Sequence, residues 1–403
     1  MSTREAPILN DVTFEELDSD PYPHYAKWRK ESPVAFLPVT ESWVVTRWDD
    51  CENVAQDETQ FATFGGPTED LIGPNVLTAA DPHPHRWMRD ALDLTLRPKA
   101  VNSYIERMAR PAARAYVEDI AAQGSADATA DLLEKISVRV VGDVLGVTDV
   151  DVDTRQRWFH ELFATLMAAT FNEEGAGAEQ KREKAEAARG EADSYLVRAV
   201  ERVTKTPDDS PISHLVHSPT ADGKPRTYDE VRGTLFVFIM GGFQEPGHGA
   251  AASLYGLLSE PEQADAVRAD PTLMSAAVHE GLRWLSPFGM TPRLAAVDIK
   301  IGDVVIPAGG TLNLVLASAN RDESRHENAE KFDVFRPRLP VASFGYGAHF
   351  CAGHFLAREL EKIALEEVFR GLPNLRLDPN TAPDIAGVEN RAVKSLPVVW
   401  DAP

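Results

Sequence analysis

Apolar residues recur every three or four positions through most of the chain, which is the spacing of amphipathic helices. Clusters of β-branched and aromatic residues beside turn residues predict a few short strands. Glycine- and proline-rich segments at 65–74 and 206–225 are expected to be loops. The predicted helices span 14–29 (interrupted at 20–23), a helix opening at 81, 101–122, 128–145, 153–169, 180–204, 231–258 and 352–369, and the predicted strands span 34–38, 42–46 and a hairpin at 304–311. The pattern indicates a mainly α fold with a small β region.

The composition is that of an ordinary soluble protein. Hydrophobic residues make up 43% of the 403 residues and charged residues 26%. No apolar run approaches the ~18 residues that cross a membrane, and the polar N-terminus does not resemble a signal peptide. We therefore expect a cytoplasmic protein. A formal net charge of −22 argues against nucleic acid or an anionic membrane as a partner, since both attract basic surfaces.

Two cysteines are too few for a disulfide framework. Cys51 has no ligand-like neighbour and is interpreted as a packing residue. Cys351 lies in the segment SFGYGAHFCAG at 343–353, directly before a predicted helix. Unpaired N–H groups at a helix start favour a thiolate, and a thiolate can bind iron. A lone glycine pair near a buried cysteine would be an ordinary turn, but its combination with Phe, His and a third glycine is more restrictive.

The segment 231–258 is apolar on all sides and should cross the core. Its middle, MGGFQEPGHG at 240–249, holds four glycines and Pro246. Inside a helix, Gly costs up to ~1 kcal/mol and Pro ~3 kcal/mol relative to Ala. Pro246 also removes the hydrogen bond to the carbonyl of Gly242, so we predict a kink there. Such a costly sequence favours a role in backbone access to a ligand.

The cysteine segment resembles the haem-binding loop of cytochromes P450, in which the cysteine is the axial thiolate of the iron. The resemblance covers nearly the whole chain. It implies a single P450 domain over residues 1–403, with haem b as cofactor and Cys351 as the metal ligand. It also implies a structural triad of Glu280, Arg283 and Arg336 that holds the cysteine loop in place.

Several further haem contacts follow from the same resemblance. Those at the propionates are His85, Arg89, Arg293 and His349, and those at the loop are Phe344, which shields the sulfur, and Gly353. His85 and Arg89 lie four residues apart on one helix face, so the alternative for them is a solvated surface pair.

The middle of the long helix departs from the usual P450 pattern. Gln244 and Glu245 stand where most P450s carry an acid and an alcohol that deliver protons. The run QEPGHG resembles bacterial P450s that O-demethylate guaiacol and related lignin-derived methoxyphenols. Glu245 is then the predicted proton donor, with a pKa raised by burial, or an acid–base group acting on hydrogen peroxide. The alternative is that Glu245 only caps the broken helix turn.

The resemblance places six residues at the substrate pocket: Leu166, Gly242, Phe288, Thr291, Val388 and Asn390. Leu166, Glu69 and Asn390 stand where we expect phenylalanine in the guaiacol enzymes. A pocket without these rings would be roomier. It would suit a bulkier phenol such as syringol or a 4-alkylguaiacol.

We therefore predict a haem-thiolate monooxygenase or peroxygenase that converts a methoxyphenol to a catechol-type product and formaldehyde. It would use O2 or H2O2, with a separate reductase or ferredoxin as electron donor, because we find no fused flavin or iron–sulfur motif. One alternative is a P450 hydroxylase of another small hydrophobic substrate, such as a terpenoid or macrolide. The other is a non-catalytic haem sensor, which predicts an output domain or a second iron ligand.

Overall fold

The structure is a computed structural model that describes residues 7–63, 66–73, 77, 82–170, 173–220 and 222–402. Helices make up 59% of it, which confirms the mainly α prediction. Among the described residues, none of the helices combines the length and the apolar character needed to span a bilayer.

The predicted helices appear in the expected order along the chain, and further helices lie between them. They are α1 (Phe14–Ser19), α2 (Tyr22–Glu31), α3 (Trp48–Gln56), α4 (Gly66–Ile72), α5 (Pro82–Leu96), α6 (Pro98–Tyr104), α7 (Arg110–Ile120), α8 (Glu134–Leu145), α9 (Val152–Thr170), α10 (Ala176–Lys205), α11 (Pro211–Val216), α12 (Tyr228–Gly242), α13 (Glu245–Ser259), α14 (Pro261–Ala269), α15 (Met274–Leu285), α16 (Leu316–Ala319) and α17 (His354–Gly371). A π-helical segment, Ile105–Ala109, joins α6 to α7, and another, Ala128–Leu133, leads into α8.

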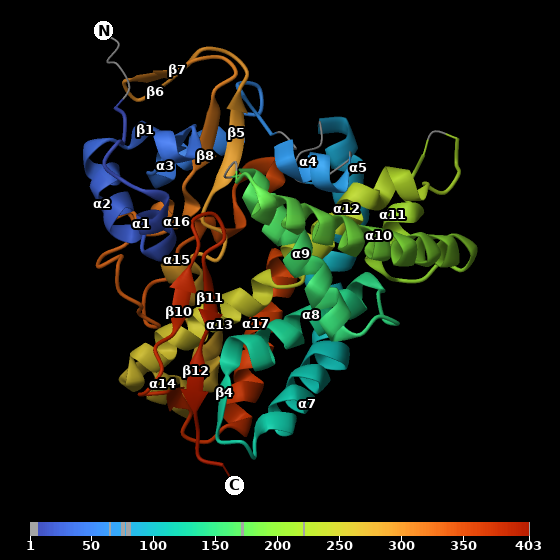
Figure 1. Cartoon of the computed structure of the whole chain (residues 1–403). Coiled ribbons are helices and arrows are strands. Elements are labelled where there is room, and N and C mark those ends of the chain that lie inside the picture. The colour runs from blue at the N-terminus through green and yellow to red at the C-terminus, as the bar shows by residue number, and fades with distance from the viewer. Residues whose placement is uncertain are drawn as a thin grey trace.

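The strands are short and form small sheets. They are β1 (Val34–Leu37), β2 (Ser42–Val45), β3 (Phe61–Ala62), β4 (Ser125–Asp127), β5 (Thr291–Ala295), β6 (Ile299–Ile301), β7 (Val304–Ile306), β8 (Thr311–Leu314), β9 (Arg376–Leu377), β10 (Asp384–Ala386), β11 (Ala392–Ser395) and β12 (Pro397–Val399). Figure 1 shows β1, β5 and β8 beside α1, α2 and α3 on one side of the molecule, while α4, α5 and α9 to α12 form the other side. α13 and α17 lie between these two parts.

The larger sheet has five strands in the order β1-β2-β8-β5-β3. β1 and β2 pair antiparallel with Val34 opposite Val45, as their branched residues predicted. β8 runs parallel to β2 and antiparallel to β5. The predicted hairpin over 304–311 is wrong in its pairing, because β7 pairs with β6 across a turn at Gly302 (φ 58°) and β8 joins the larger sheet.

Two segments predicted as loops contain helices, α4 and α11. At the start of α11, the Ser210 hydroxyl accepts a hydrogen bond from the N–H of Ser213, and Pro211 occupies the first helical position. Ile212 and Leu215 of α11 are fully buried. The proline that suggested a connector therefore starts a helix, where its missing N–H costs nothing.

The long apolar segment breaks where Pro246 predicted. α12 ends at Gly242 and α13 begins at Glu245, so the helix is interrupted for two residues. Both halves are buried along most of their length and belong to the largest hydrophobic cluster.

The glycines near the helix break do not all serve the same purpose. A Cβ at Gly247 would lie 2.9 Å from the carbonyl oxygen of Leu133, and a Cβ at Gly249 would lie 2.5 Å from Oε1 of Glu361. These two glycines allow α13 to approach its neighbours closely, which differs from the predicted role in ligand access. Gly241 is exposed, and a Cβ there would meet no atom within 4 Å. Gly241 alone among these three faces open space.

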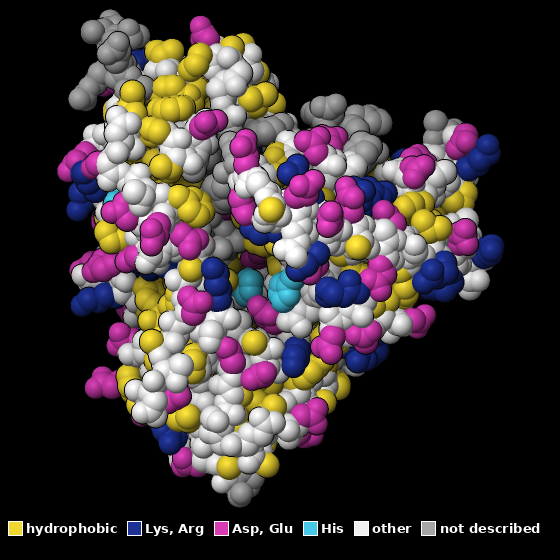
Figure 2. Space-filling view, in the orientation of Figure 1, with side chains coloured by type: hydrophobic (Ala, Val, Ile, Leu, Met, Phe, Trp, Pro, Cys, Tyr) yellow, Lys and Arg dark blue, Asp and Glu magenta, His cyan; other side chains and the backbone are white. Residues whose placement is uncertain are grey.

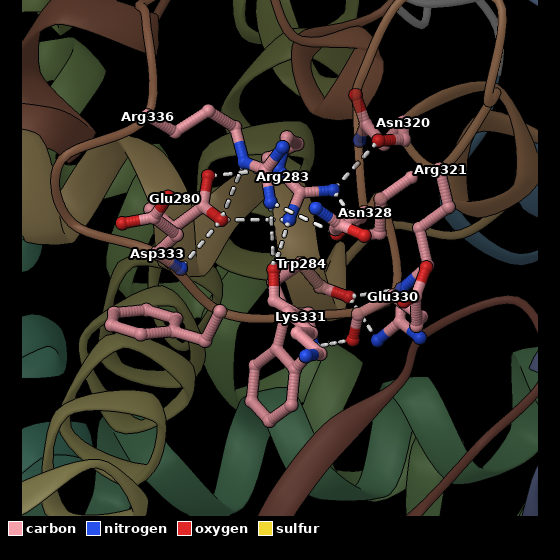
Figure 3. Close-up of polar contacts among 12 residues, drawn as sticks. Glu280, Arg283, Trp284, Asn320, Arg321, Asn328, Glu330, Lys331, Asp333 and Arg336 are labelled. Carbon is pink, nitrogen blue, oxygen red and sulfur yellow. Dashed lines mark hydrogen bonds and ion pairs between the residues drawn. The ribbon is translucent and has the colours of Figure 1, made fainter.

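A buried ion-pair network fixes the end of α15 (Figure 3). Arg283 donates from Nε to Oε2 of Glu280 (2.8 Å) and from Nη2 to Oε1 (2.7 Å). Nε of Arg336 donates to Oε1 of Glu280 over 3.0 Å. Arg283 also donates to the carbonyl oxygens of Asn320 and Ala329. The predicted triad is confirmed as a buried structural unit.

Hydrogen bonds connect this network to the start of the cysteine segment. The Asn320 side chain donates to Oγ of Ser343 (2.8 Å) and accepts from the N–H of Ala342 (2.6 Å). Oγ of Ser343 donates to the carbonyl oxygen of Leu282 in α15 (2.6 Å). The cysteine segment therefore begins at a point fixed to α15.

We expect Arg283→Met to destabilise the protein by about 3–5 kcal/mol, because it leaves the buried Glu280 carboxylate without its main partner. Chemical denaturation followed by circular dichroism measures this loss. Lys27→Met is the control, since Lys27 and Asp11 form an exposed ion pair at 2.9 Å. An Arg283→Met variant as stable as the Lys27→Met control would contradict the structural role of the triad.

Candidate active site

The cysteine segment has a backbone that requires glycine. Gly345 and Gly347 have φ values of 71° and 65°, in the left-handed region that side chains disfavour. A Cβ at Gly347 would also lie 2.9 Å from the carbonyl oxygen of Ala55. The N–H of Cys351 donates to the carbonyl oxygen of Phe344 over 2.9 Å, which closes the loop.

The surroundings of Cys351 have opposing effects on the pKa of its thiol. Burial raises its pKa, and the Gly353 N–H and the charges of Arg89 and Arg358 offset this only in part. The Gly353 N–H favours the thiolate, as the position before a helix predicts, but without a bound cation burial has the larger effect. A bound metal cation would supply the missing positive charge. The guanidinium carbon of Arg358 lies 4.6 Å from the ring centroid of Phe344, so both residues pack beside the loop.

The predicted propionate contacts lie together. The rings of His85 and His349 are 4.2 Å apart, and Arg89 donates to the carbonyl oxygen of Phe350. Burial and the charges of His85, Arg293 and Arg89 lower the pKa of His349 to about 4. Among the described residues, no carboxylate pairs with the buried Arg293, and Nδ1 of His349 has no hydrogen-bond partner. Such a set of cations and donors fits an anionic group.

Gln244 points toward α8 and α9. Its Nε2 lies 3.0 Å from Oε2 of Glu134 and 2.6 Å from Nε2 of His160. Nε2 of His248 lies 3.0 Å from Oε1 of the same Glu134, and Gln156 donates to Oε2 over 2.8 Å. Sequence reasoning missed Glu134 and His160, because they lie far from the helix break along the chain. His248 stands within the QEPGHG run and could have been found there.

Glu245 is placed differently from Gln244. Burial raises the pKa of Glu245 to about 7, and the charge of His248 lowers it in part. Its Oε2 is buried, and no hydrogen-bond partner for it lies within the described residues. The Glu245 charge in turn helps to raise the pKa of Cys351, Glu361 and Glu389. Because no described hydrogen bond joins this carboxyl to the helix end, the capping alternative gains no support.

Figure 2 shows a hollow near the middle of the drawn face, between the strand-rich part and the helical part, with histidine and acidic side chains at its edge.

A profile of the family described as "Cytochrome P450" matches residues 31–384. The chain is a cytochrome P450. This P450 is 29% identical to the cytochrome P450 monooxygenase PikC of Streptomyces venezuelae, over 99% of this chain and 96% of the relative. It is 27% identical to 6-deoxyerythronolide B hydroxylase of Saccharopolyspora erythraea, over 97% and 98% of the two chains. Its fold matches P450BioI, solved with a fatty-acyl carrier protein, at a TM-score of 0.85 and 25% identity over 96% and 100% of the chains.

The cofactor of a P450 is haem b, and the residues of this P450 fit it. Cys351 would hold the iron, while Arg293, His349, His85 and Arg89 would face the propionates. The orphaned Nδ1 of His349 and the unpaired Arg293 carry this assignment, because a buried cation without an anion is costly. P450s use O2 and separate redox partners such as a ferredoxin.

Two of the predicted pocket residues are adjacent in this P450. Phe288 and Asn390 form an antiparallel β-bridge, and the N–H of Gly289 donates to the carbonyl oxygen of Glu389 over 2.6 Å. Thr291 follows in β5, with Oγ1 3.4 Å from Nη1 of Arg293. These residues lie beside Arg293, one of the predicted propionate contacts.

The other predicted pocket residues are more dispersed. Leu166 lies on α9 and packs partly buried against the main core. Val388 is 4% exposed and belongs to the cluster that contains Met290. A Cβ at Gly242 would lie 3.1 Å from Val141, so Gly242 packs against α8 and Gly241 faces the open space.

Glu69, which the sequence placed near an expected aromatic position, is exposed on α4. Its carbonyl oxygen accepts a hydrogen bond from the N–H of Gly73. Glu69 therefore lies at the surface and supplies no aromatic ring to hold a substrate.

The two cysteines offer a matched test of metal binding. Cys51 is fully buried, and its Sγ donates to the carbonyl oxygen of Val45 over 3.2 Å, as expected of a packing residue. We expect Cys351→Ser to lose the red-shifted absorbance band that a thiolate-bound, reduced haem shows with carbon monoxide. Cys51→Ser should keep it. Retention of the band in Cys351→Ser would remove Cys351 as the ligand.

Proposed function

We propose that this P450 O-demethylates lignin-derived methoxyphenols such as syringol, guaiacol or a 4-alkylguaiacol. The products are a catechol-type phenol and formaldehyde. One observation carries the proposal: Glu245 presents an unpartnered carboxyl at the helix break, where most P450s have an alcohol. The QEPGHG run around it resembles that of the guaiacol O-demethylases.

The overall reaction consumes the aryl methyl ether, O2, two electrons and two protons, and yields the phenol, formaldehyde and water. With H2O2 as oxidant, no further electrons or protons are needed. When bound, haem supplies the oxidising chemistry at the methoxy carbon. The residues of this chain bind and orient the phenol, exclude water and provide protons.

Polar side chains lead from the surface to His248, which lies close to Glu245 in the sequence. The His160 side chain is 53% exposed, and it contacts Gln244, which in turn contacts Glu134. His248 contacts Glu134 and lies three residues after Glu245 on α13. Burial lowers the pKa of His248, but its hydrogen bond to Glu134 and the two nearby carboxyls raise it overall. We propose that His248 returns a proton from these side chains to Glu245 after Glu245 has given one up.

A carboxyl with a pKa of about 7 suits this role. Near neutral pH it is present in both forms, so it can donate a proton and also accept one from H2O2. An alcohol cannot act as a base in this way. The peroxygenase mode of the proposal depends on this difference.

The relatives favour a second candidate, hydroxylation of a larger apolar molecule. The 27% identical relative is named for hydroxylation of 6-deoxyerythronolide B, and neither relative reported above is named an O-demethylase. Exposed Gly241 and the smaller Leu166 and Asn390 in place of aromatic rings leave room for such a substrate. In this case the same site would hydroxylate a terpenoid, macrolide or steroid carbon and release no formaldehyde.

Formaldehyde release separates the two candidates. We expect release from syringol, guaiacol or 4-propylguaiacol with H2O2 alone or with a surrogate reductase and ferredoxin. A colorimetric formaldehyde assay and product chromatography measure it, with heat-inactivated protein as the control. If no methoxyphenol yields formaldehyde with either oxidant, the O-demethylase proposal is wrong.

Glu245→Ala should lower the peroxide-driven rate by about 100-fold, since it removes the acid–base group. With O2 and a reductase, the wild-type rate should fall as pH rises through about 7, because Glu245 donates its proton only below its pKa. Glu245→Gln should remove this decline. The control is Glu262→Gln, an exposed carboxyl of α14. Unchanged rates in Glu245→Ala would assign the residue a structural role.

A further inference from the structure

The segment between β10 and β11 is fixed against the predicted pocket wall. The N–H of Gly387 donates to the carbonyl oxygen of Asp18 (3.0 Å), and the Arg391 guanidinium donates to the same oxygen (3.0 Å). A Cβ at Gly289 would lie 2.8 Å from the carbonyl oxygen of Val388, so the two segments are in close contact. The position of the next residue, Glu389, is therefore set by backbone contacts on both sides.

The Glu389 carboxyl has no protein partner. Within the described part of the chain, no hydrogen bond or ion pair reaches it, although its backbone carbonyl is bonded to Gly289. The residue keeps part of its surface open, while burial and the charge of Glu245 raise its pKa to about 7. Glu389 stands between Val388 and Asn390, and its backbone is bonded to Gly289 beside Phe288. It therefore lies among three of the predicted pocket residues.

An enclosed carboxyl without a partner is costly, by several kcal/mol if it is charged. Neighbouring paired carboxyls show how this chain normally avoids the cost: Glu134 has three partners, and Glu280 pairs with two arginines. Glu389 departs from this pattern, as do Glu245 and Glu361, whose Oε2 atoms are buried without a described partner. Unlike Glu361, Glu389 keeps part of its surface open to a ligand.

We propose that Glu389 binds the substrate by accepting a hydrogen bond from its hydroxyl group, and so orients the neighbouring methoxy group toward the haem side of the pocket. This inference rests on the proposed function, since it assigns the phenol hydroxyl a partner. A neutral hydroxyl suits an enclosed carboxyl better than an ammonium does, because less hydration is lost when it enters. Glu389 therefore selects phenols over their fully methylated ethers.

Ligand binding tests this selection without turnover. The ligands are guaiacol and 1,2-dimethoxybenzene, which differ only in the hydroxyl, together with 2-methoxybenzylamine, which carries an ammonium. Titration of the haem-loaded enzyme is followed by the change in haem absorbance and by calorimetry. We expect wild type to bind guaiacol about tenfold more tightly than the dimethyl ether, as for one hydrogen bond to a carboxylate.

Glu389→Leu should weaken guaiacol binding about tenfold and leave the ether unchanged, so that the preference disappears. Asp384→Asn, an exposed carboxyl of β10 in the same hairpin, should keep the wild-type preference. If Glu389→Leu does not retain haem, Glu389→Gln serves instead. Its weaker neutral acceptor should reduce the preference about threefold.

Three results would overturn the inference. The first is that wild type shows no preference for the phenol over the ether. The second is that the Glu389 variants lose affinity for both ligands equally. The third is that wild type binds the amine most tightly and Glu389→Gln loses that affinity, which would mean recognition of a cation. The outcome is independent of the formaldehyde assay. A Glu389-dependent phenol preference without formaldehyde refutes only the O-demethylation, and formaldehyde release without that preference refutes only the role of Glu389.

Discussion

The close approach of α13 to its neighbours is the constraint on which the site depends. Gly247 lets the start of α13 rest on the backbone at Leu133, and Gly249 lets it meet Glu361 of α17. Farther along, Gly256 packs against the ring of Phe332. A side chain at any of these positions would push α13 outward. The helix break would then move away from the cysteine loop, because α17 begins directly after that loop.

This approach brings several carboxyls into the interior, where their different surroundings give them different pKa values. Burial raises the pKa of Glu134, but its partners, led by His248, lower it below the usual value. Glu245 and Glu389 have no such partners, and burial raises the pKa of each to about 7. Carboxyls whose pKa values are pushed apart serve different purposes. Glu134 organises the polar side chains between α8, α9 and α13, while Glu245 and Glu389 stay available to exchange protons or bind a ligand.

The sequence predicted the features that depend on local chemistry. Pro246 located the helix break, the glycines around Cys351 located the loop, and the resemblance located the ion pair of Glu280 and Arg283. Gly247 and Gly249 were predicted to give a ligand access to the backbone, whereas they allow helix packing. The sequence does not show that Gly247 faces Leu133 or that Gly249 faces Glu361. Local signals also mistook α4 and α11 for loops, since burial of residues such as Ile212 outweighed their prolines.

The polar partners of the site were beyond sequence reasoning for a related reason. Glu134 lies 110 residues before Gln244, and it meets Gln244 and His248 only once α8 packs on α13. Glu389, for which we propose a substrate contact, stands between Val388 and Asn390, which the resemblance placed at the pocket. The position of this segment depends on the contacts of Gly387 and Gly289 with the backbone, and no periodic pattern encodes these.

The shared scaffold explains why relatives of this P450 say little about its substrate. An identity of 27–29% spread over nearly the full length preserves the cysteine loop, the triad and the helix order, which are needed for any P450 reaction. Substrate choice rests on a few side chains that the scaffold tolerates in many forms. We propose that Gln244, Glu245 and Glu389 are of this kind. No described hydrogen bond reaches the carboxyls of Glu245 and Glu389, and Glu134, the partner of Gln244, is also held by His248 and Gln156. Substitution of these three side chains would therefore leave the contacts that hold the fold in place.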